Sequence, residues 1–149
     1  MSRLNKGLFT SKSNEWSTPQ SLFDELNSEF NFTLDPASTH ENAKCEKYYT
    51  QEDDGLNQPW ADESVFCNPP YGREIGQWVK KAYEESLLLR EGVIVLLIPA
   101  RTDTKYWHEY IFGKAEVRFL KGRVKFGEAK QGAPFPSAVI VYNGNETNI

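Results

Sequence analysis

The residues best suited to chemistry in this sequence form the run Cys67-Asn68-Pro69-Pro70-Tyr71-Gly72, directly after the apolar segment 65–67. The side-chain oxygen of Asn68 is a hydrogen-bond acceptor, and the carbonyl oxygen of Pro69 is a second one. Prolines fix φ and supply no N–H donor, so the turn is stiff and presents acceptors. Tyr71 adds a flat ring on which a nucleic-acid base can stack, a contact worth about 1–3 kcal/mol.

Two acceptors beside one amino group suit the transfer of a methyl group to a planar exocyclic nitrogen. Such a nitrogen is a poor nucleophile, because its lone pair is delocalised into the ring. Acceptors on its two hydrogens draw the group towards tetrahedral geometry, and they stabilise the positive charge that develops during attack. Pro-Pro and Tyr-Gly pairs are also ordinary turn composition. The residues Asn68–Tyr71 alone therefore favour a catalytic turn and a plain turn equally.

Two predicted elements flank this turn. The segment 65–67 is typical of a strand that ends at Asn68, and apolar residues at helical spacing from Ile75 to Leu87 predict an amphipathic helix. Gly92 stands near the position where a glycine commonly ends a helix. The unbroken apolar run 93–98 predicts a central parallel strand that is covered on both faces.

The chain before the turn predicts a helix followed by a strand. Thr18 is expected to cap the helix, with Pro19 at its first position and Asn31 at its end. Residues 32–35 predict a short strand that ends in an acid, and a further helix is expected to begin in the small residues 36–39. The sequence then predicts a short strand, a turn and a buried anchor at 47–50, 53–55 and Trp60.

The chain after the apolar run continues to alternate between helix and strand. A short helix capped by Asp103 or Thr104 is predicted to end at Phe112, with Gly113 as its terminator. Strands are then predicted at 115–120, 124–126 and 137–142, with a Gly/Pro loop at 127–136. This alternation predicts an α/β protein with a mainly parallel, twisted sheet whose last strands include an antiparallel pair.

Length and composition indicate one globular domain. The chain has 149 residues, of which 26% are charged and 39% are apolar, a balance typical of folded soluble proteins. Its apolar runs are shorter than the roughly 18–20 residues of a transmembrane helix, and no signal-peptide pattern follows Met1. Cys45 and Cys67 have no metal-ligand spacing, which favours reduced thiols. We therefore expect a cytoplasmic protein without a membrane partner.

Charge is distributed unevenly along the chain. The net charge of −4 argues mildly against a generic nucleic-acid binder. Residues 101–130, however, hold eight basic side chains against four acidic ones, and such a local excess is able to follow a phosphate backbone. Arg123 and Lys125 alternate along the strand predicted at 124–126, so they are expected to share one face. A solvated basic surface is the alternative interpretation.

Five motifs, taken in this order, resemble the small phage-type DNA N6-adenine methyltransferases, the Dam-like family. They are Trp16-Ser17-Thr18-Pro19, Leu34-Asp35-Pro36-Ala37, the run from Phe66 to Gly72, the run from Leu97 to Thr104, and Gly122-Arg123-Val124-Lys125-Phe126. The resemblance spans residues 15–142 and implies one methyltransferase domain, with flexible ends at 1–14 and 143–149. It also implies a compact class I, Rossmann-like sheet, S-adenosylmethionine as methyl donor and adenine in DNA as acceptor.

The resemblance assigns roles to individual residues. The family's catalytic motif is matched by Asn68, Pro69, Pro70 and Tyr71. Donor-binding positions are matched by Trp16, Thr18, Pro19, Asp35, Pro36, Ala37, Asp54 and Asn68. For contact with DNA we expect the basic residues Arg101, Lys121, Arg123 and Lys125. Two departures are the replacement of the Gly-rich turn of larger relatives by Ala37-Ser38-Thr39 and the lack of a segment large enough for a separate target-recognition domain.

In the expected reaction adenine leaves the duplex, because a stacked and paired N6 cannot reach a donor sulfonium. The base stacks on Tyr71, its amino group donates to Asn68 and to the Pro69 carbonyl, and the nitrogen attacks the sulfonium methyl in line. No metal is required. Two alternatives stay open: a methyltransferase that acts on RNA or on a protein glutamine amide, and a non-catalytic DNA-binding module with the same fold.

Overall fold

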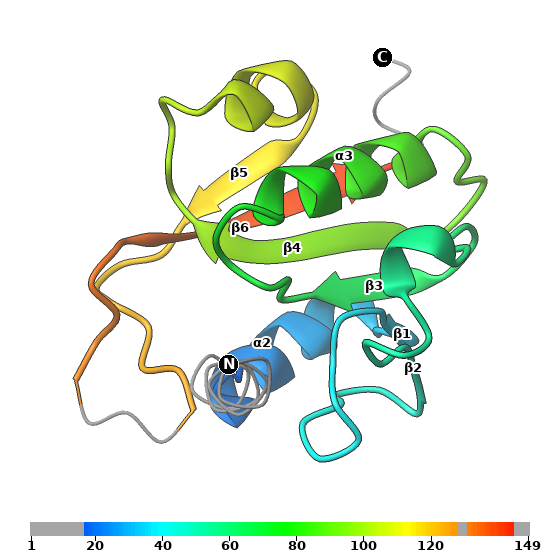
Figure 1. Ribbon diagram of the computed structural model, residues 1–149, viewed down its shortest axis with the longest axis horizontal. Helices are drawn as coiled ribbons and strands as arrows, with labels where there is room; N and C mark the ends of the chain where they lie inside the picture. Colours follow the sequence, from blue (N-terminus) through cyan, green and yellow to red (C-terminus); the bar gives the residue numbers. More distant parts are fainter. Residues whose placement is uncertain (1–16, 128–130, 145–149) are drawn as a thin grey trace, which may run out of the picture.

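The computed structural model describes residues 17–127 and 131–144, which form a six-stranded sheet with helices on both faces (Figure 1). The strands are β1 (Leu34–Asp35), β2 (Lys47–Tyr48), β3 (Ser64–Cys67), β4 (Val93–Pro99), β5 (Glu116–Phe119) and β6 (Ser137–Asn143). The helices are α2 (Gln20–Phe30), the 3-10 helix η1 (Gly55–Asn57), α3 (Ile75–Ser86) and the π-helical turn η2 (Trp107–Ile111).

The strand order is β2-β1-β3-β4-β6-β5. The first four of these strands pair in parallel, whereas β6 runs antiparallel to β4 on one side and to β5 on the other. Because β6 opposes both neighbours, β5 points the same way as β4 (Figure 1). The carboxyl ends of β1 to β5 therefore reach one edge of the sheet, here named the carboxyl edge. This mixed sheet confirms the predicted α/β class, the mainly parallel pairing and the antiparallel strands near the end of the chain.

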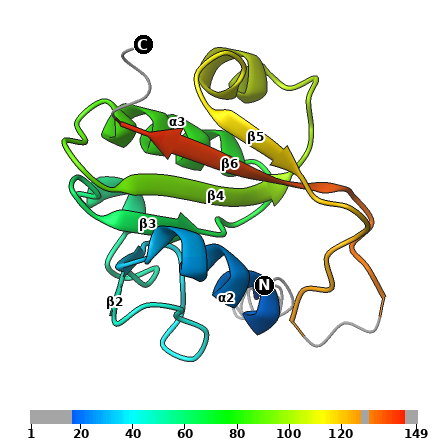
Figure 2. The same ribbon diagram turned by 180° about the vertical axis from the view of Figure 1, so that it is seen from behind.

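Strand β4 forms the centre of the core. All seven of its residues are buried, and their side chains alternate between two apolar clusters. Ile94, Leu96 and Ile98 join α3 and η2 on one face, whereas the alternate residues join α2 on the other (Figures 1 and 2). Burial of one such side chain contributes about 1.5–3 kcal/mol. The run 93–98 was thus correctly predicted to be a central strand covered on both faces.

Helix α3 confirms the amphipathic pattern downstream of the turn. Its apolar stripe, with Ile75, Trp78, Val79 and Ala82, is buried against the sheet. The prediction that Gly92 ends this helix is wrong, because the helix ends at Ser86 with Leu87 as its C-cap. Gly92 instead has φ +96 just before β4, where a Cβ would lie 2.4 Å from the Glu63 carbonyl oxygen. Only glycine fits that close approach without strain.

Three predicted helix features upstream and downstream of the turn are also wrong. Thr18 does not cap α2: Pro19 is the N-cap residue, and no side chain bonds to the helix start. No helix begins in 36–39, because Ser38 N–H donates to the Tyr49 carbonyl at 3.2 Å and holds the chain beside β2. The helix predicted to end at Phe112 is present at 105–111, but its predicted cap is wrong: the π-helical part has Tyr106 as N-cap, and neither Asp103 nor Thr104 caps it. The end of α2 at Asn31, in the left-handed conformation, was predicted correctly.

The strand predicted at 124–126 is absent from the described sheet. Strand β6 already pairs with β4 and β5, so neither of its sides is open to a further strand. Residues 120–126 instead form a loop that pairs locally, with the Ala133 N–H donating to the Val124 carbonyl at 2.9 Å. Of the expected flexible ends, 1–14 lies outside the described residues, and Asn143 is the last residue of β6. No helix among the described residues is long and apolar enough to span a membrane.

Candidate active site at the carboxyl edge

A cavity of about 660 Å³ opens at the carboxyl edge, between the end of β1, the turn after β3 and the start of α3. This volume falls within the range of roughly 300–1,000 Å³ that is common for small-molecule sites. The predicted site residues that line it are Thr18, Asp35, Pro36, Ala37, Asp54, Asn68, Pro69, Pro70 and Tyr71. Residues distant in the sequence thus meet around one space. Pro19 does not line this cavity, and Trp16 lies outside the described residues.

Asn68 leaves the sheet directly after Cys67, the last residue of β3, and its side chain lines the cavity. Its amide Nδ2 donates to the hydroxyl oxygen of Thr18 at 3.0 Å. This hydrogen bond joins residues 50 positions apart in the chain. Burial raises the pKa of the Cys67 thiol well above its ordinary value, so this thiol stays protonated and is not a nucleophile. Cys67 therefore adds no nucleophile to the turn that follows it.

Tyr71 is fixed by contacts on its hydroxyl and its ring. The hydroxyl donates to the Leu97 carbonyl oxygen at 3.1 Å, and burial raises the pKa of this phenol well above its ordinary value. Phe126 and Phe135 meet the ring edge-on, with centroids 6.0 and 5.7 Å away. The sequence analysis gave neither phenylalanine this role: Phe126 appeared only within the motif 122–126, and both lie about 55–65 positions further along the chain. Phe126 and Phe135 thus support the turn from Asn68 to Tyr71.

Asp35 ends β1 and is buried in the cavity wall. Its carboxylate accepts hydrogen bonds from the backbone N–H groups of Lys44, at 3.0 Å, and Ala37, at 3.3 Å. Desolvation outweighs these two bonds and raises the pKa of Asp35 from 3.8 to about 6. The carboxylate therefore arranges the loop between β1 and β2 and also places a negative charge beside the cavity near neutral pH.

Replacement of Asp35 by Asn should remove a pH dependence of stability. A carboxyl group with a raised folded-state pKa favours the folded protein when protonated, so stability falls as the pH rises from 3.8 to about 6. The rise in pKa corresponds to a loss of about 3 kcal/mol in the free energy of unfolding. This loss is complete once the pH is well above 6 and the carboxyl group is ionised in the folded protein. Between pH 4 and pH 7 the free energy of unfolding should fall further in the wild type than in Asp35→Asn. The difference between the two falls should approach this value. Parallel curves in denaturant titrations at these two pH values would contradict this role.

The far wall of the cavity is built around Gly55, where two segments approach closely. A Cβ at Gly55 would lie 2.1 Å from the Pro36 carbonyl oxygen and 3.2 Å from the Trp78 ring, so a larger residue would displace the cavity lining. Asp54 precedes it with φ 59, as the N-cap of η1. The Asp54 carboxylate accepts a hydrogen bond from Asn57. The predicted turn at 53–55 is thus part of the site.

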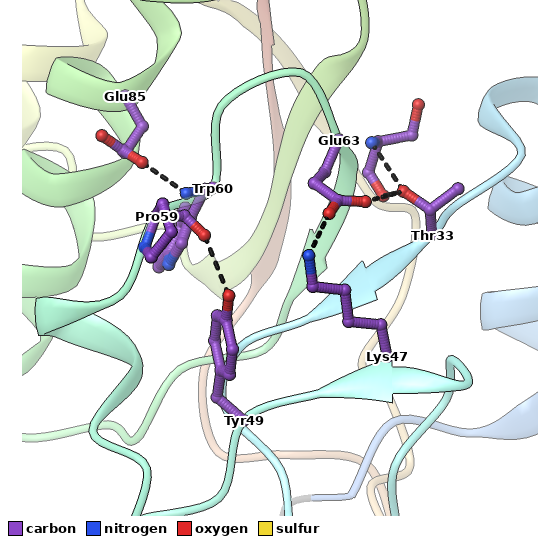
Figure 3. A network of polar contacts seen from close by, with 8 residues as sticks. Thr33, Lys47, Tyr49, Pro59, Trp60, Glu63 and Glu85 are labelled. Carbon is purple, nitrogen blue, oxygen red and sulfur yellow. Dashed lines mark hydrogen bonds and ion pairs between the residues drawn. The ribbon is translucent and has the colours of Figure 1, made fainter.

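A network of polar contacts secures the same wall (Figure 3). Trp60 donates its backbone N–H to the carboxylate of Glu85 on α3, and its indole N–H donates to the Gly55 carbonyl at 2.9 Å. The Tyr49 hydroxyl donates to the Pro59 carbonyl at 3.1 Å. Trp60 is fully buried and stacks on Trp78 with ring centroids 6.1 Å apart. The predicted anchor at Trp60 therefore connects the cavity wall to α3.

The predicted DNA-contacting residues follow the carboxyl ends of β4 and β5. Arg101, Lys121, Arg123 and Lys125 are exposed. The Arg101 guanidinium lies 5.9 Å from the Phe135 ring centroid, next to the ring that supports Tyr71. Arg123 and Lys125 do not share a strand face, because 123–126 forms a loop.

Not every basic side chain of 101–130 is available to a phosphate. Arg118 is held by the carboxylates of Glu29 and Glu116, and Lys105 lies 3.7 Å from Glu109. Arg123 donates to the Ala133 carbonyl at 3.2 Å while staying exposed. Fewer basic side chains are therefore available to a phosphate than the eight counted from the sequence.

These features define an α/β protein with a ligand cavity at the carboxyl edge of a mixed sheet, walled on one side by an Asn-Pro-Pro-Tyr turn. The described residues contain no group of three or more His, Cys, Asp or Glu placed to hold a metal ion. Comparison with known proteins gives the family. The chain belongs to the DNA N-6-adenine-methyltransferase (Dam) family, whose model matches residues 7–141.

Two relatives illustrate this membership. The chain is 34% identical over 108 residues to the DNA N-6-adenine-methyltransferase of Escherichia phage T1, a match that covers 71% of this chain and 44% of the relative. It is 39% identical over 64 residues to the putative methyltransferase YfdM of Escherichia coli (strain K12), covering 38% of this chain and 70% of that protein. The chain thus spans less than half the length of the phage T1 relative.

Proposed function

We propose that this protein is a DNA methyltransferase that transfers a methyl group from S-adenosylmethionine to N6 of an extruded adenine. The observation that carries the proposal is the position of the Asn68–Tyr71 turn. It lines the same cavity as the carboxylates of Asp35 and Asp54, at the carboxyl edge of the sheet. Ligands of open α/β sheets bind outside the carboxyl ends of the strands. Family membership and the sequence of the phage T1 relative support the same reaction.

The residues around the cavity fit S-adenosylmethionine as the methyl donor. The donor is cationic, and the cavity wall carries the carboxylates of Asp35 and Asp54. Two buried polar atoms in the residues that line the cavity, Ser38 Oγ and Trp78 Nε1, have no hydrogen-bond partner among the described residues. Buried polar groups are normally paired, so these two suit a site that is completed by a polar ligand. When bound, the donor supplies an electrophilic methyl group on its sulfonium.

The chain's own residues perform the remaining steps. Asn68 Oδ1 and the Pro69 carbonyl accept the two amino hydrogens of the target base and stabilise the positive charge on its nitrogen. Because both acceptors belong to a rigid turn, they are oriented before the reaction begins, and this preorganisation lowers the barrier. The Tyr71 ring provides the stacking surface. The proton leaves to water after transfer, so no side chain is needed as a strong base.

The exposed basic side chains of the loop after β5 are proposed to contact DNA phosphates. Each phosphate contact contributes about 0.9 to the slope of log binding constant against log salt on duplex DNA. The double change Arg123→Ala and Lys125→Ala should therefore weaken DNA binding and flatten this slope by about 1.8 at most. Donor affinity should be unchanged, because neither residue lines the cavity.

A matched control for this prediction removes the same charge elsewhere. Lys80 on α3 and Arg90 after it are also exposed, and the double change Lys80→Ala and Arg90→Ala should leave the salt slope unaltered. Equal slopes for all three proteins would exclude phosphate contact by Arg123 and Lys125. A lower melting temperature of the first variant alone, with an unaltered slope, would assign Arg123 to bracing the loop through Ala133.

The proposed function is tested by incubating the protein with methyl-labelled donor and, separately, DNA, RNA and protein acceptors. Label transferred to DNA alone supports the proposal. Transfer to RNA or to protein glutamine alone would replace the proposed substrate by one of these. Donor and DNA binding without any transfer would identify a non-catalytic DNA-binding module.

A further inference from the structure

The hydroxyl of Thr18 contacts the catalytic turn instead of its own helix. Pro19 is the N-cap residue of α2, and the helix start has no side-chain cap. Thr18 is only 5% exposed, and its hydroxyl oxygen accepts the hydrogen bond from Asn68 Nδ2 at 3.0 Å. Threonine is a common N-cap residue, but Thr18 instead forms a hydrogen bond with Asn68 in the cavity wall.

This hydrogen bond gives the two branches of the Asn68 amide different surroundings. An asparagine amide carries a donor on one branch and an acceptor on the other. Its terminal torsion is broad and roughly two-fold, so rotamer preference alone does not distinguish the two orientations. With Nδ2 facing the Thr18 hydroxyl, Oδ1 is the branch suited to accept a hydrogen from an amino group of a substrate. The reverse orientation would present a donor to that amino group and repel it.

Thr18 is itself fixed by the backbone on both of its sides. Pro19 has φ −57, and its carbonyl accepts the Phe23 N–H at 3.1 Å. On the other side, the Ser17 carbonyl accepts the Gly127 N–H at 2.7 Å. Gly127 directly follows Phe126, whose ring meets that of Tyr71 edge-on. Thr18 is therefore held in a fixed position beside the Asn68 amide.

We propose that Thr18 is a positioning residue for methyl transfer, which orients the Asn68 amide so that Oδ1 accepts a hydrogen of the target amino group. This role rests on the proposed function and adds to it a residue that acts only through Asn68. It differs from the donor-binding role that the family resemblance implies for Thr18, because a positioning residue changes the rate of transfer without changing donor affinity.

The test compares Thr18→Val, which keeps the shape and removes the hydroxyl, with Thr18→Ser, which keeps the hydroxyl. Both changes are made in the full chain and again in an Asn68→Ala background. Loss of one hydrogen bond corresponds to a change of about 3- to 10-fold in a rate or binding constant. We expect Thr18→Val to lower the single-turnover rate on DNA by that factor and Thr18→Ser to retain most of the rate. In the Asn68→Ala background Thr18→Val should have no further effect, because interacting residues are not additive.

Two readouts besides activity separate positioning from other roles. Donor affinity, measured by calorimetry, should be the same for wild type and Thr18→Val. Melting temperatures should be measured for the wild type, Thr18→Val, Asn68→Ala and the double variant. The effects of the two changes on the melting temperature should not add, which shows coupling between Thr18 and Asn68. Thr33→Val serves as the control, since it removes a hydroxyl that bonds Glu63 and the Ser64 N–H at the other end of β1 (Figure 3). It should lower the melting temperature and leave the rate unchanged.

Several outcomes would overturn the positioning role. Thr18→Val could lower the rate equally in the Asn68→Ala background, which would mean that Thr18 acts independently of Asn68. It could instead weaken donor binding at an unchanged rate, which would make Thr18 a donor-binding residue. If the wild type transfers no methyl group, the proposed function fails. The contact between Thr18 and Asn68 is tested separately, and an absence of coupling in the melting temperatures would contradict it.

Discussion

Asn68→Ala should lower the single-turnover rate of methyl transfer by about 10²–10³-fold, the loss that follows removal of one preorganised acceptor from a transition state. Donor affinity should change much less, because the amide oxygen is needed when charge develops on the target nitrogen and not when the donor binds. Rapid-quench measurement with enzyme in excess over DNA, paired with donor titration by calorimetry, separates the two effects.

A control for this variant removes another amide with a structural hydrogen bond. Asn27 Oδ1 accepts the Phe32 N–H at 2.8 Å at the end of α2, and Asn27 does not line the cavity. Asn27→Ala should lower the melting temperature without lowering the rate of transfer. A near-normal rate for Asn68→Ala would exclude Asn68 as a catalytic residue.

Tyr71→Ala should weaken productive binding of the target base, whereas Tyr71→Phe should retain it. Loss of base stacking corresponds to about 1–3 kcal/mol, or roughly 5- to 150-fold in affinity. Tyr71→Phe keeps the ring between Phe126 and Phe135 and removes the hydrogen bond to the Leu97 carbonyl, worth about 0.5–1.5 kcal/mol of stability. DNA with the fluorescent base 2-aminopurine at the target position reports extrusion directly.

The comparison of the two Tyr71 variants has a clear negative result. Equal fluorescence gain on binding for the wild type and Tyr71→Ala would mean that the extruded base does not stack on this ring. Loss of the gain in Tyr71→Phe as well would assign the effect to the hydroxyl and its bond to Leu97. Melting temperatures of both variants are needed, because removal of a buried ring also destabilises the core.

The sequence predicted the parts of the fold that depend on local periodicity. The apolar run 93–98 and the stripe from Ile75 to Ala82 bury themselves as expected, because each pattern suits only one arrangement against a core. The segments 36–39 and 124–126 were predicted wrongly, because backbone hydrogen bonds to Tyr49 and Ala133 determine their conformation. Those partners lie 9 to 11 positions further along the chain, and no periodic pattern in the segments themselves indicates them.

The candidate site shows the same division. The turn from Asn68 to Tyr71 was singled out from its residue types together with the four other motifs of the family resemblance, because the turn alone favours a catalytic turn and a plain turn equally. The bond between Thr18 and Asn68 was not, because the helix start explains the same residues without it. Contacts between residues that are distant in the sequence depend on the tertiary structure, so the sequence alone does not reveal them.

The central claim is methyl transfer to N6 of adenine in DNA, and one measurement tests it most directly. DNA lacking methylated bases is incubated with the protein and S-adenosylmethionine, digested to nucleosides, and separated by chromatography with mass detection. We expect the wild type to form N6-methyl-2′-deoxyadenosine. We expect Asn68→Ala to form it at an initial rate about 10²–10³-fold lower. Detection of N4-methylcytosine alone, or of no methylated base, would contradict the account.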